Sequence, residues 1–209
     1  ANERHGTQRE SWTLEVSGGA TPRARARPHL RLGGDGVALH VVASSRSWRT
    51  SSLPARGAHL AADPVELEGG GGIVCDPPPG RVMMVRPGHS FKALATSIDA
   101  AVARWDLAHV HEFELADGRR IGYPDDEFAE LEWLDHERLK VARELGPGDE
   151  FRYVFDLGDN WRYRCVVLDE KVDPLEAYGI LPEQPVAIWG WGWIPDQYGR
   201  RSADDTGEE

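Results

Sequence analysis

The chain has 209 residues, a formal net charge of −11 and 28% charged residues, which is enough length for one domain with a buried core. No apolar run approaches the roughly 18 residues of a membrane-spanning helix, and the polar start from Ala1 to Glu10 is unlike a signal peptide. The two cysteines, Cys75 and Cys165, form no CxxC motif, so the sequence predicts two reduced thiols, a cytoplasmic location and no metal or other cofactor.

Residues 1–62 differ from the rest in charge and composition. They hold nine Arg, no Lys and four acidic residues, whereas residues 63–209 hold 15 basic and 31 acidic residues. Their apolar runs are short, although Val37 to Ala43 could form a strand. We expect this low-complexity segment to be disordered or not native, and an arm that binds nucleic acid through Arg23 to Arg27 is the alternative. A domain is expected over residues 63–205, followed by a short acidic tail at 206–209.

The first elements of this domain are two short strands and a helix. Apolar residues on both sides of Gly69 to Gly72, and again from Arg81 to Val85, predict strands joined by turns. Ser90 can cap a helix that runs to about Arg104. Apolar residues recur at helical spacing and predict one buried stripe, made of Phe91, Leu94, Ile98, Val102 and Trp105.

The middle of the chain alternates between strand and helix patterns. His109 to Ala116 is a predicted strand with His109, His111 and Phe113 on one face. A helix is expected around residues 125–134, and another strand from Leu139 to Arg143.

A hairpin at residues 151–169 gives the clearest pattern. Alternating apolar residues predict two strands that share a face, with Phe155 opposite Tyr163 and a loop of Gly158, Asp159 and Asn160. Asn160 would take the left-handed position of this loop. The same register places Asp156 opposite Arg162.

These elements together resemble a known family. The hairpin reads Phe-Arg-Tyr-Val-Phe-Asp-Leu-Gly-Asp-Asn-Trp-Arg-Tyr, and the helix, the His-x-His-Glu-Phe strand and a Trp-Gly-Trp-Ile-Pro-Asp-Gln-Tyr segment flank it in order. Over residues 64–205 the chain is similar to plasmid pRiA4b ORF-3-like proteins. The resemblance implies an α+β fold with a β-grasp-like first half and an association with plasmids or insertion elements, but no activity. Tyr163 stands where the family often has His.

The sequence therefore predicts an α+β domain, with a mixed or antiparallel sheet, one main amphipathic helix and a C-terminal aromatic hairpin. A non-catalytic module that binds an unknown protein or small ligand is the favoured function. The alternatives are a metal-dependent or hydrolytic enzyme built on the His109 and His111 face, and a nucleic-acid-associated protein. The net negative charge of the domain argues against binding of duplex DNA. No membrane role is expected. The candidate ligand residues are His109, His111, Asp156, Asp159, Trp161, Tyr163, Trp189, Trp191, Trp193 and Tyr198.

Whether the three indoles at 189–193 form a stacking platform or cover the sheet is left open by their spacing. If this segment is extended, all three lie on one face, as a platform requires. Large aromatic side chains also dominate core burial, which favours a covering flap.

Overall fold

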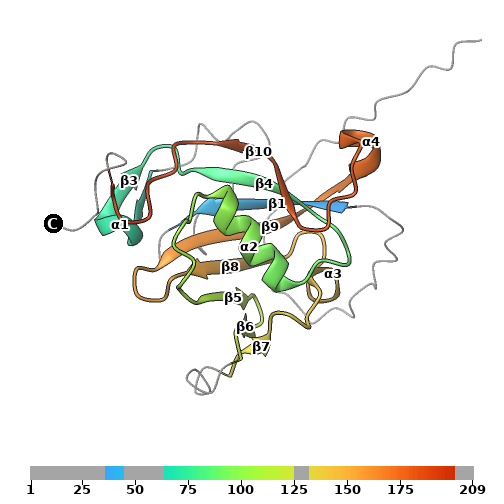
Figure 1. The fold of residues 1–209 in the computed structure, drawn as a ribbon, viewed down its shortest axis with the longest axis horizontal. Coiled ribbons are helices and arrows are strands. Elements are labelled where there is room, and N and C mark those ends of the chain that lie inside the picture. The colour runs from blue at the N-terminus through green and yellow to red at the C-terminus, as the bar shows by residue number, and fades with distance from the viewer. Residues whose placement is uncertain (1–35, 45–63, 125–131, 201–209) are drawn as a thin grey trace, which may run out of the picture.

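A largely antiparallel sheet forms the centre of the molecule (Figure 1). The computed structural model describes residues 36–44, 64–124 and 132–200. In these ranges the sheet has the strand order β10-β4-β1-β9-β8-β5-β6-β7, in which only β6 and β7 run parallel. Its strands are Gly36–Ala43 (β1), Gly80–Val85 (β4), His111–Leu115 (β5), Arg120–Gly122 (β6), Leu134–Asp135 (β7), Glu150–Phe155 (β8), Trp161–Val172 (β9) and Val186–Trp191 (β10).

A small second sheet and four helices complete the described part. Strands Val65–Leu67 (β2) and Ile73–Cys75 (β3) pair with each other and are joined by the glycine turn Gly69–Gly72 (α1), where Gly70 and Gly71 have positive φ. The other helices are Phe91–Ala101 (α2), Val141–Glu144 (α3) and Pro174–Tyr178 (α4). The α+β prediction is thus confirmed, whereas the β-grasp-like first half stays a prediction. None of the helices in the described ranges is long and apolar enough to cross a membrane.

Strand β1 corrects the expected start of the domain. It lies in the middle of the sheet, paired with β4 on one side and β9 on the other, and Leu39 and Val41 are buried. The prediction of a strand from Val37 to Ala43 was correct, but the boundary at residue 63 left this strand outside the folded unit. Two flanking ladders of hydrogen bonds stabilise β1 in spite of its surroundings in sequence. The other parts of residues 1–62 and the tail 206–209 lie outside the described residues.

Helix α2 begins as its sequence predicts. The Ser90 hydroxyl accepts a hydrogen bond from the Ala93 N–H at 3.2 Å, which satisfies one of the free donors of the first turn. Four members of the apolar stripe, Phe91, Leu94, Ile98 and Val102, are buried. The helix ends at Ala101, before the expected Arg104, so the fifth member, Trp105, lies beyond it and is 46% exposed.

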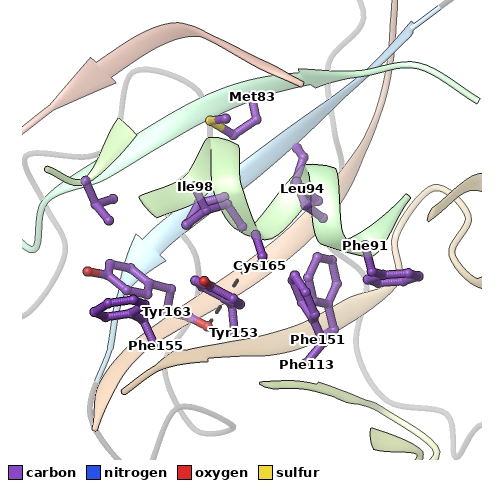
Figure 2. Close-up of a cluster of buried hydrophobic side chains, with 14 of the residues drawn as sticks. Met83, Phe91, Leu94, Ile98, Phe113, Phe151, Tyr153, Phe155, Tyr163 and Cys165 are labelled. Atoms are coloured by element: carbon purple, nitrogen blue, oxygen red, sulfur yellow. Dashed lines mark hydrogen bonds between the residues drawn. The ribbon is translucent and has the colours of Figure 1, made fainter. Parts of the chain in front are cut away.

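The core lies between α2 and one face of the sheet (Figure 2). Leu94 and Ile98 point from the helix toward aromatic rings on β8 and β9. Phe113 on β5 packs edge-on against Phe91 with ring centroids 5.1 Å apart, and lies 4.8 Å from the ring of Tyr153. Ile98 and Val102 bury the C-terminal end of α2 in the same core, and from there the chain continues into the candidate site.

The hairpin has the predicted shared face but a different register. Phe155 pairs with Trp161, and Tyr153 pairs with Tyr163. One strand is therefore shifted by two residues along the other, compared with the expected pairing. The loop therefore has five residues, from Asp156 to Asn160, and both of its ends have positive φ. Asn160 does take the expected left-handed conformation. Asp156 does not face Arg162, which instead pairs with Val154.

Two further predictions were wrong within the described residues. Leu139 to Arg143 is not a strand, because the chain makes a single helical turn, α3, in which the Leu145 N–H donates to the Val141 carbonyl. Leu134, at the end of the expected helix 125–134, lies in strand β7 beside Ile121 of β6. Residues 125–131 of that helix lie outside the described ranges.

Candidate functional site

Three segments that are distant in sequence meet at the hairpin end of the sheet. They are the connection from α2 to β5, the loop between β8 and β9, and residues 195–200 after β10. Together they contribute the side chains that we call the acidic cluster: Asp106, His109, Asp156, Asp159 and Tyr198. Four of these five were candidate residues in the sequence, and Asp106 was not.

Gln197 fastens the C-terminal segment to this end of the sheet. Its side chain is fully buried, and its Oε1 accepts hydrogen bonds from the backbone N–H groups of Trp105 at 3.0 Å and Asp106 at 3.1 Å. Its Nε2 donates to the Asp106 carbonyl at 3.1 Å. The amide thus satisfies three polar groups where no strand could pair, and it sets the position of Tyr198, the next residue.

The imidazole of His109 lies between two acidic groups. Its Nδ1 is 3.1 Å from Asp156 Oδ2, and its Nε2 is 2.8 Å from the Tyr198 hydroxyl. The hydroxyl donates its single hydrogen to Asp106 Oδ2 at 2.9 Å, so the imidazole must donate at Nε2. The other ring nitrogen, Nδ1, faces the Asp156 carboxylate, so both nitrogens of the imidazole are engaged by neighbouring side chains.

The turn of the hairpin fixes Asp156 in this arrangement. Its backbone has a φ of 57°, and its Oδ1 accepts hydrogen bonds from the N–H groups of Gly158 at 2.9 Å and Asp159 at 3.3 Å. The other carboxylate oxygen is thereby left facing His109. The side chain is 10% exposed, whereas that of Asp106 is 35% exposed, and Asp159 stands at the exposed tip of the loop.

The cluster has more negative than positive charge. Burial, the hydrogen bond to Asp106 and the charges of Asp106, Asp156 and Asp159 raise the pKa of Tyr198 to about 12. Hydrogen bonds from the Ala108 N–H and from Tyr198 lower the pKa of Asp106 below its usual value. At neutral pH the phenol is therefore neutral, and the carboxylates of Asp106 and Asp156 flank one imidazole. A phenol in this state is a poor nucleophile and a poor base.

An aromatic side chain and a guanidinium lie next to the cluster. The Arg200 guanidinium is centred 3.9 Å from the ring of Trp105 and donates to Asp196 Oδ2 at 3.0 Å. Trp105 Nε1 donates to the same oxygen at 3.2 Å. Burial raises the pKa of Asp196, but hydrogen bonds from Arg200 and from the Tyr198 N–H outweigh it and lower the pKa below the usual range. This contact shows that the end of the sheet can hold a guanidinium between an indole and a carboxylate.

His109 and His111 were expected to share one face and one function, but they engage different partners. His111 Nε2 is 2.9 Å from His136 Nδ1, and its ring packs against Phe113 and Tyr153. Burial and the nearby charges of His136 and Lys92 lower the pKa of His111 to about 3. In the part of the chain that the structure describes, no three His, Cys, Asp or Glu side chains are grouped as ligands for a metal ion.

Trp161 and Tyr163, two of the candidate residues, are buried in the core. Trp161 is 1% exposed, and its ring packs on Gly69, where an added Cβ would come within 2.3 Å of it. Tyr163 is 3% exposed and stacks on Tyr153 with ring centroids 6.1 Å apart. The two cysteines are free and buried, as the sequence predicts.

The three tryptophans near the C-terminus do not form one platform. Trp191 is buried against Gly80, and its Nε1 donates to the Pro78 carbonyl at 2.9 Å, so it covers the end of β4. Trp189 is 43% exposed and lies 5.2 Å from the Trp191 ring, while Trp193 is 67% exposed. An irregularity in β10 between Ala187 and Trp189, and the positive φ of Gly192, break the expected alternation.

An apolar hollow lies at the end of the core opposite the acidic cluster. It is bounded by the ends of β1, β4 and β9 and by α3, with Val37, Val85, Val141 and Val167 in its lining. Its free volume of about 20 Å³ is room for about one water molecule. The hollow is too small for an organic ligand.

Several residues of the site were missed from sequence. Asp106, Asp196 and Gln197 lie in segments with no periodic pattern, and His136 follows a segment for which a helix was expected. One signal was present, because Asp side chains often bond nearby backbone N–H groups in turns, and the Asp196 carboxylate accepts from the Tyr198 N–H at 3.0 Å.

The fold and the site define a small α+β protein with one helix across a mostly antiparallel sheet and an acidic end. The sequence matches the plasmid pRiA4b ORF-3-like protein family over residues 74–190, more than half of the chain, and the chain belongs to this family. No curated protein matches it. A crystal structure of a protein of unknown function from Methanosarcina mazei Go1 is similar in fold, with a TM-score of 0.53 and 19% identity over 79% of this chain and 75% of that one.

Proposed function

We propose that this protein is a non-catalytic binding module, and that the acidic cluster binds a cationic side chain of a partner protein. The observation that carries the proposal is that the Asp106 and Asp156 carboxylates flank one imidazole at a partly exposed end of the sheet, where the charge of Asp159 also acts on Tyr198. In the described ranges, the ion-pair contacts of Asp106 and Asp156 are both with the imidazole of His109. A guanidinium or ammonium group would balance the remaining negative charge.

The surroundings of the cluster support a cationic ligand. Trp105 is 46% exposed and already holds the guanidinium of Arg200, and the neighbouring Leu107 is 58% exposed. An arginine or lysine side chain has an apolar stem and a charged head, so it can use both kinds of surface at once.

An enzymatic role has less support. The Tyr198 phenol donates to a carboxylate, the imidazole of His109 is held on both sides, and Asp156 caps its own turn, so each candidate group already has an internal structural task. The family description refers to a plasmid, and on this ground alone we propose an association with plasmids or insertion elements. A cytoplasmic location stays a prediction.

The test is calorimetric titration of the full chain with a synthetic peptide of alternating glycine and arginine, and with its glutamate counterpart. Asp106→Asn with Asp159→Asn removes two charges while keeping the side-chain shapes. The control, Glu176→Gln with Glu183→Gln, removes the same charge near the far end of β9. We expect binding of the arginine peptide only, weakened at least ten-fold by the first pair and little changed by the control.

Two results would refute the proposal. One is equal binding of the arginine and glutamate peptides. The other is equal affinity of the two charge-matched variants for the arginine peptide, since the net charge of the chain and not the cluster would then be responsible.

A further inference from the structure

Helix α4 and the residues after it expose an unusual amount of apolar surface. Four large side chains within seven residues are each about half exposed: Leu175 at 56%, Tyr178 at 46%, Ile180 at 51% and Leu181 at 52%. Single exposed apolar side chains are common on soluble proteins, but a group of this kind marks an interaction site. We call this surface the α4 patch. It begins two residues after the end of β9, whereas the acidic cluster includes the loop before the start of β9.

The chain that carries the α4 patch is held at its start. The Asp173 carboxylate accepts hydrogen bonds from the N–H groups of Leu175 at 2.9 Å and Glu176 at 3.1 Å. Gly179, with a φ of 70°, ends the helix and donates to the Leu175 carbonyl at 2.9 Å. These two caps give the short helix a defined shape, so that Leu175 and Tyr178 project from a fixed backbone.

The same chain is held at its end. The Pro182 carbonyl accepts hydrogen bonds from Arg86 Nη1 at 3.1 Å and from His89 Nε2 at 3.3 Å. His89 is buried and accepts the Arg86 N–H at Nδ1, so its Nε2 carries the hydrogen that bonds to Pro182. The exposed side chains Ile180 and Leu181 therefore lie between two anchored points.

The border of the α4 patch is acidic. Among the side chains that the structure describes, the exposed charged ones beside it in sequence are Asp169, Lys171, Asp173, Glu176 and Glu183, four acids and one base. A second copy of the chain would bring this acidic border against itself, which is unfavourable. A partner segment with apolar side chains and Lys or Arg beside them would instead satisfy both features.

We propose that the α4 patch is a docking surface for a basic, apolar segment of a partner protein. This surface is separate from the acidic cluster and needs apolar contacts that the cluster does not, so the inference stands without the proposed function. The partner would insert large apolar side chains between Leu175, Tyr178 and Leu181 and pair its positive charges with Glu176 and Glu183.

The experiment measures binding of the full chain to a fluorescent amphipathic helix made of leucine and lysine, by anisotropy at two salt concentrations. A leucine–glutamate helix of the same pattern is the control peptide. The variant pair Leu175→Ser with Leu181→Ser changes the apolar surface and leaves the charge unchanged. Val74→Ser is the matched control, because Val74 on β3 is 65% exposed. Leu181→Ser alone is a milder second variant, and circular dichroism confirms that each chain is folded.

We expect the double serine variant to bind the leucine–lysine helix at least ten-fold more weakly and Val74→Ser to bind it like the unaltered chain. In a chain that already carries Asp106→Asn and Asp159→Asn, so that the acidic cluster takes no part, Glu176→Gln with Glu183→Gln should weaken binding and reduce its salt dependence. Equal affinity of the unaltered chain and both serine variants would overturn the proposal, as would equal binding of the leucine–glutamate helix. A concentration-dependent dimer that Leu181→Ser abolishes would assign the patch to self-association and also overturn it.

Discussion

Trp161 is expected to contribute more to stability than any exposed tryptophan of this chain. Its ring is 1% exposed, lies against the Gly69 and Gly70 backbone, and is covered by the Arg104 guanidinium at 3.9 Å. Replacing it by alanine would leave a cavity in the core, which costs about 3–5 kcal/mol for a buried aromatic residue. Loss of the cation–π contact adds about 1 kcal/mol. We therefore expect Trp161→Ala to destabilise the fold by roughly 4–6 kcal/mol.

The measurement is urea unfolding followed by circular dichroism, with the midpoint and the slope fitted separately. Trp193→Ala is the control, because Trp193 is 67% exposed, and its effect should stay within about 0.5 kcal/mol. Trp161→Phe should cost less than the alanine variant. None of the described residues accepts a hydrogen bond from Trp161 Nε1, so phenylalanine loses ring volume but no hydrogen bond.

Gly69 provides an independent check of the same contact. A Cβ added there would lie 2.3 Å from the Trp161 ring, so Gly69→Ala must displace the ring or the turn and should also destabilise the protein. The reasoning fails if Trp161→Ala costs less than about 1 kcal/mol, or if it costs no more than Trp193→Ala.

Three other predictions concern pH, the N-terminal strand and DNA. Burial raises the pKa of the Asp99 carboxyl to about 7 in the folded chain. The unfolded chain therefore loses the carboxyl proton at a lower pH than the folded chain does. The contribution of Asp99 to the free energy of unfolding is full below about pH 4 and is lost as the pH rises through 7. The Tyr153 hydroxyl lies 2.7 Å from Asp99, and an asparagine there can still accept its hydrogen bond. In thermal melts, Asp99→Asn should therefore gain stability relative to the unaltered chain as the pH rises from about 5 to about 8. A difference in stability between the two chains that stays constant over this pH range would contradict the prediction. A chain that begins at Gly36 should melt cooperatively, whereas one that begins at Asp63 has no β1 between β4 and β9 and should not; equal melting of the two would show that β1 is dispensable. The chain that begins at Gly36 holds 31 acidic and 18 basic residues, an excess of 13 negative charges, so it should not bind duplex DNA at about 150 mM salt in a titration, and micromolar binding would refute this.

Local patterns predicted the elements whose stability comes from neighbours in sequence. The Ser90 cap and the stripe from Phe91 to Val102 specify α2, and parity alone placed the apolar residues of β8 and β9 on one face. The register of the hairpin was missed because two left-handed residues, Asp156 and Asn160, lengthen the loop, and sequence alone suggested only the second.

The remaining features depend on contacts between distant segments. Strand β1 has little around it in sequence to suggest a domain, and its stability comes from the two strands that flank it. The candidate site was predicted as a set of residue types, and His109, Asp156 and Tyr198 do come together. What brings them together is the docking of Gln197 on the backbone of Trp105 and Asp106, which no periodic pattern can indicate.

The central claim is that the carboxylates of Asp106, Asp156 and Asp159 at the hairpin end of the sheet form a binding site for a cation. The measurement that tests it most directly is the affinity of the full chain for the glycine–arginine peptide, compared between Asp106→Asn with Asp159→Asn and the charge-matched pair Glu176→Gln with Glu183→Gln. Our account predicts that the first pair binds at least ten-fold more weakly than the second, with both chains folded. Equal affinities would contradict it.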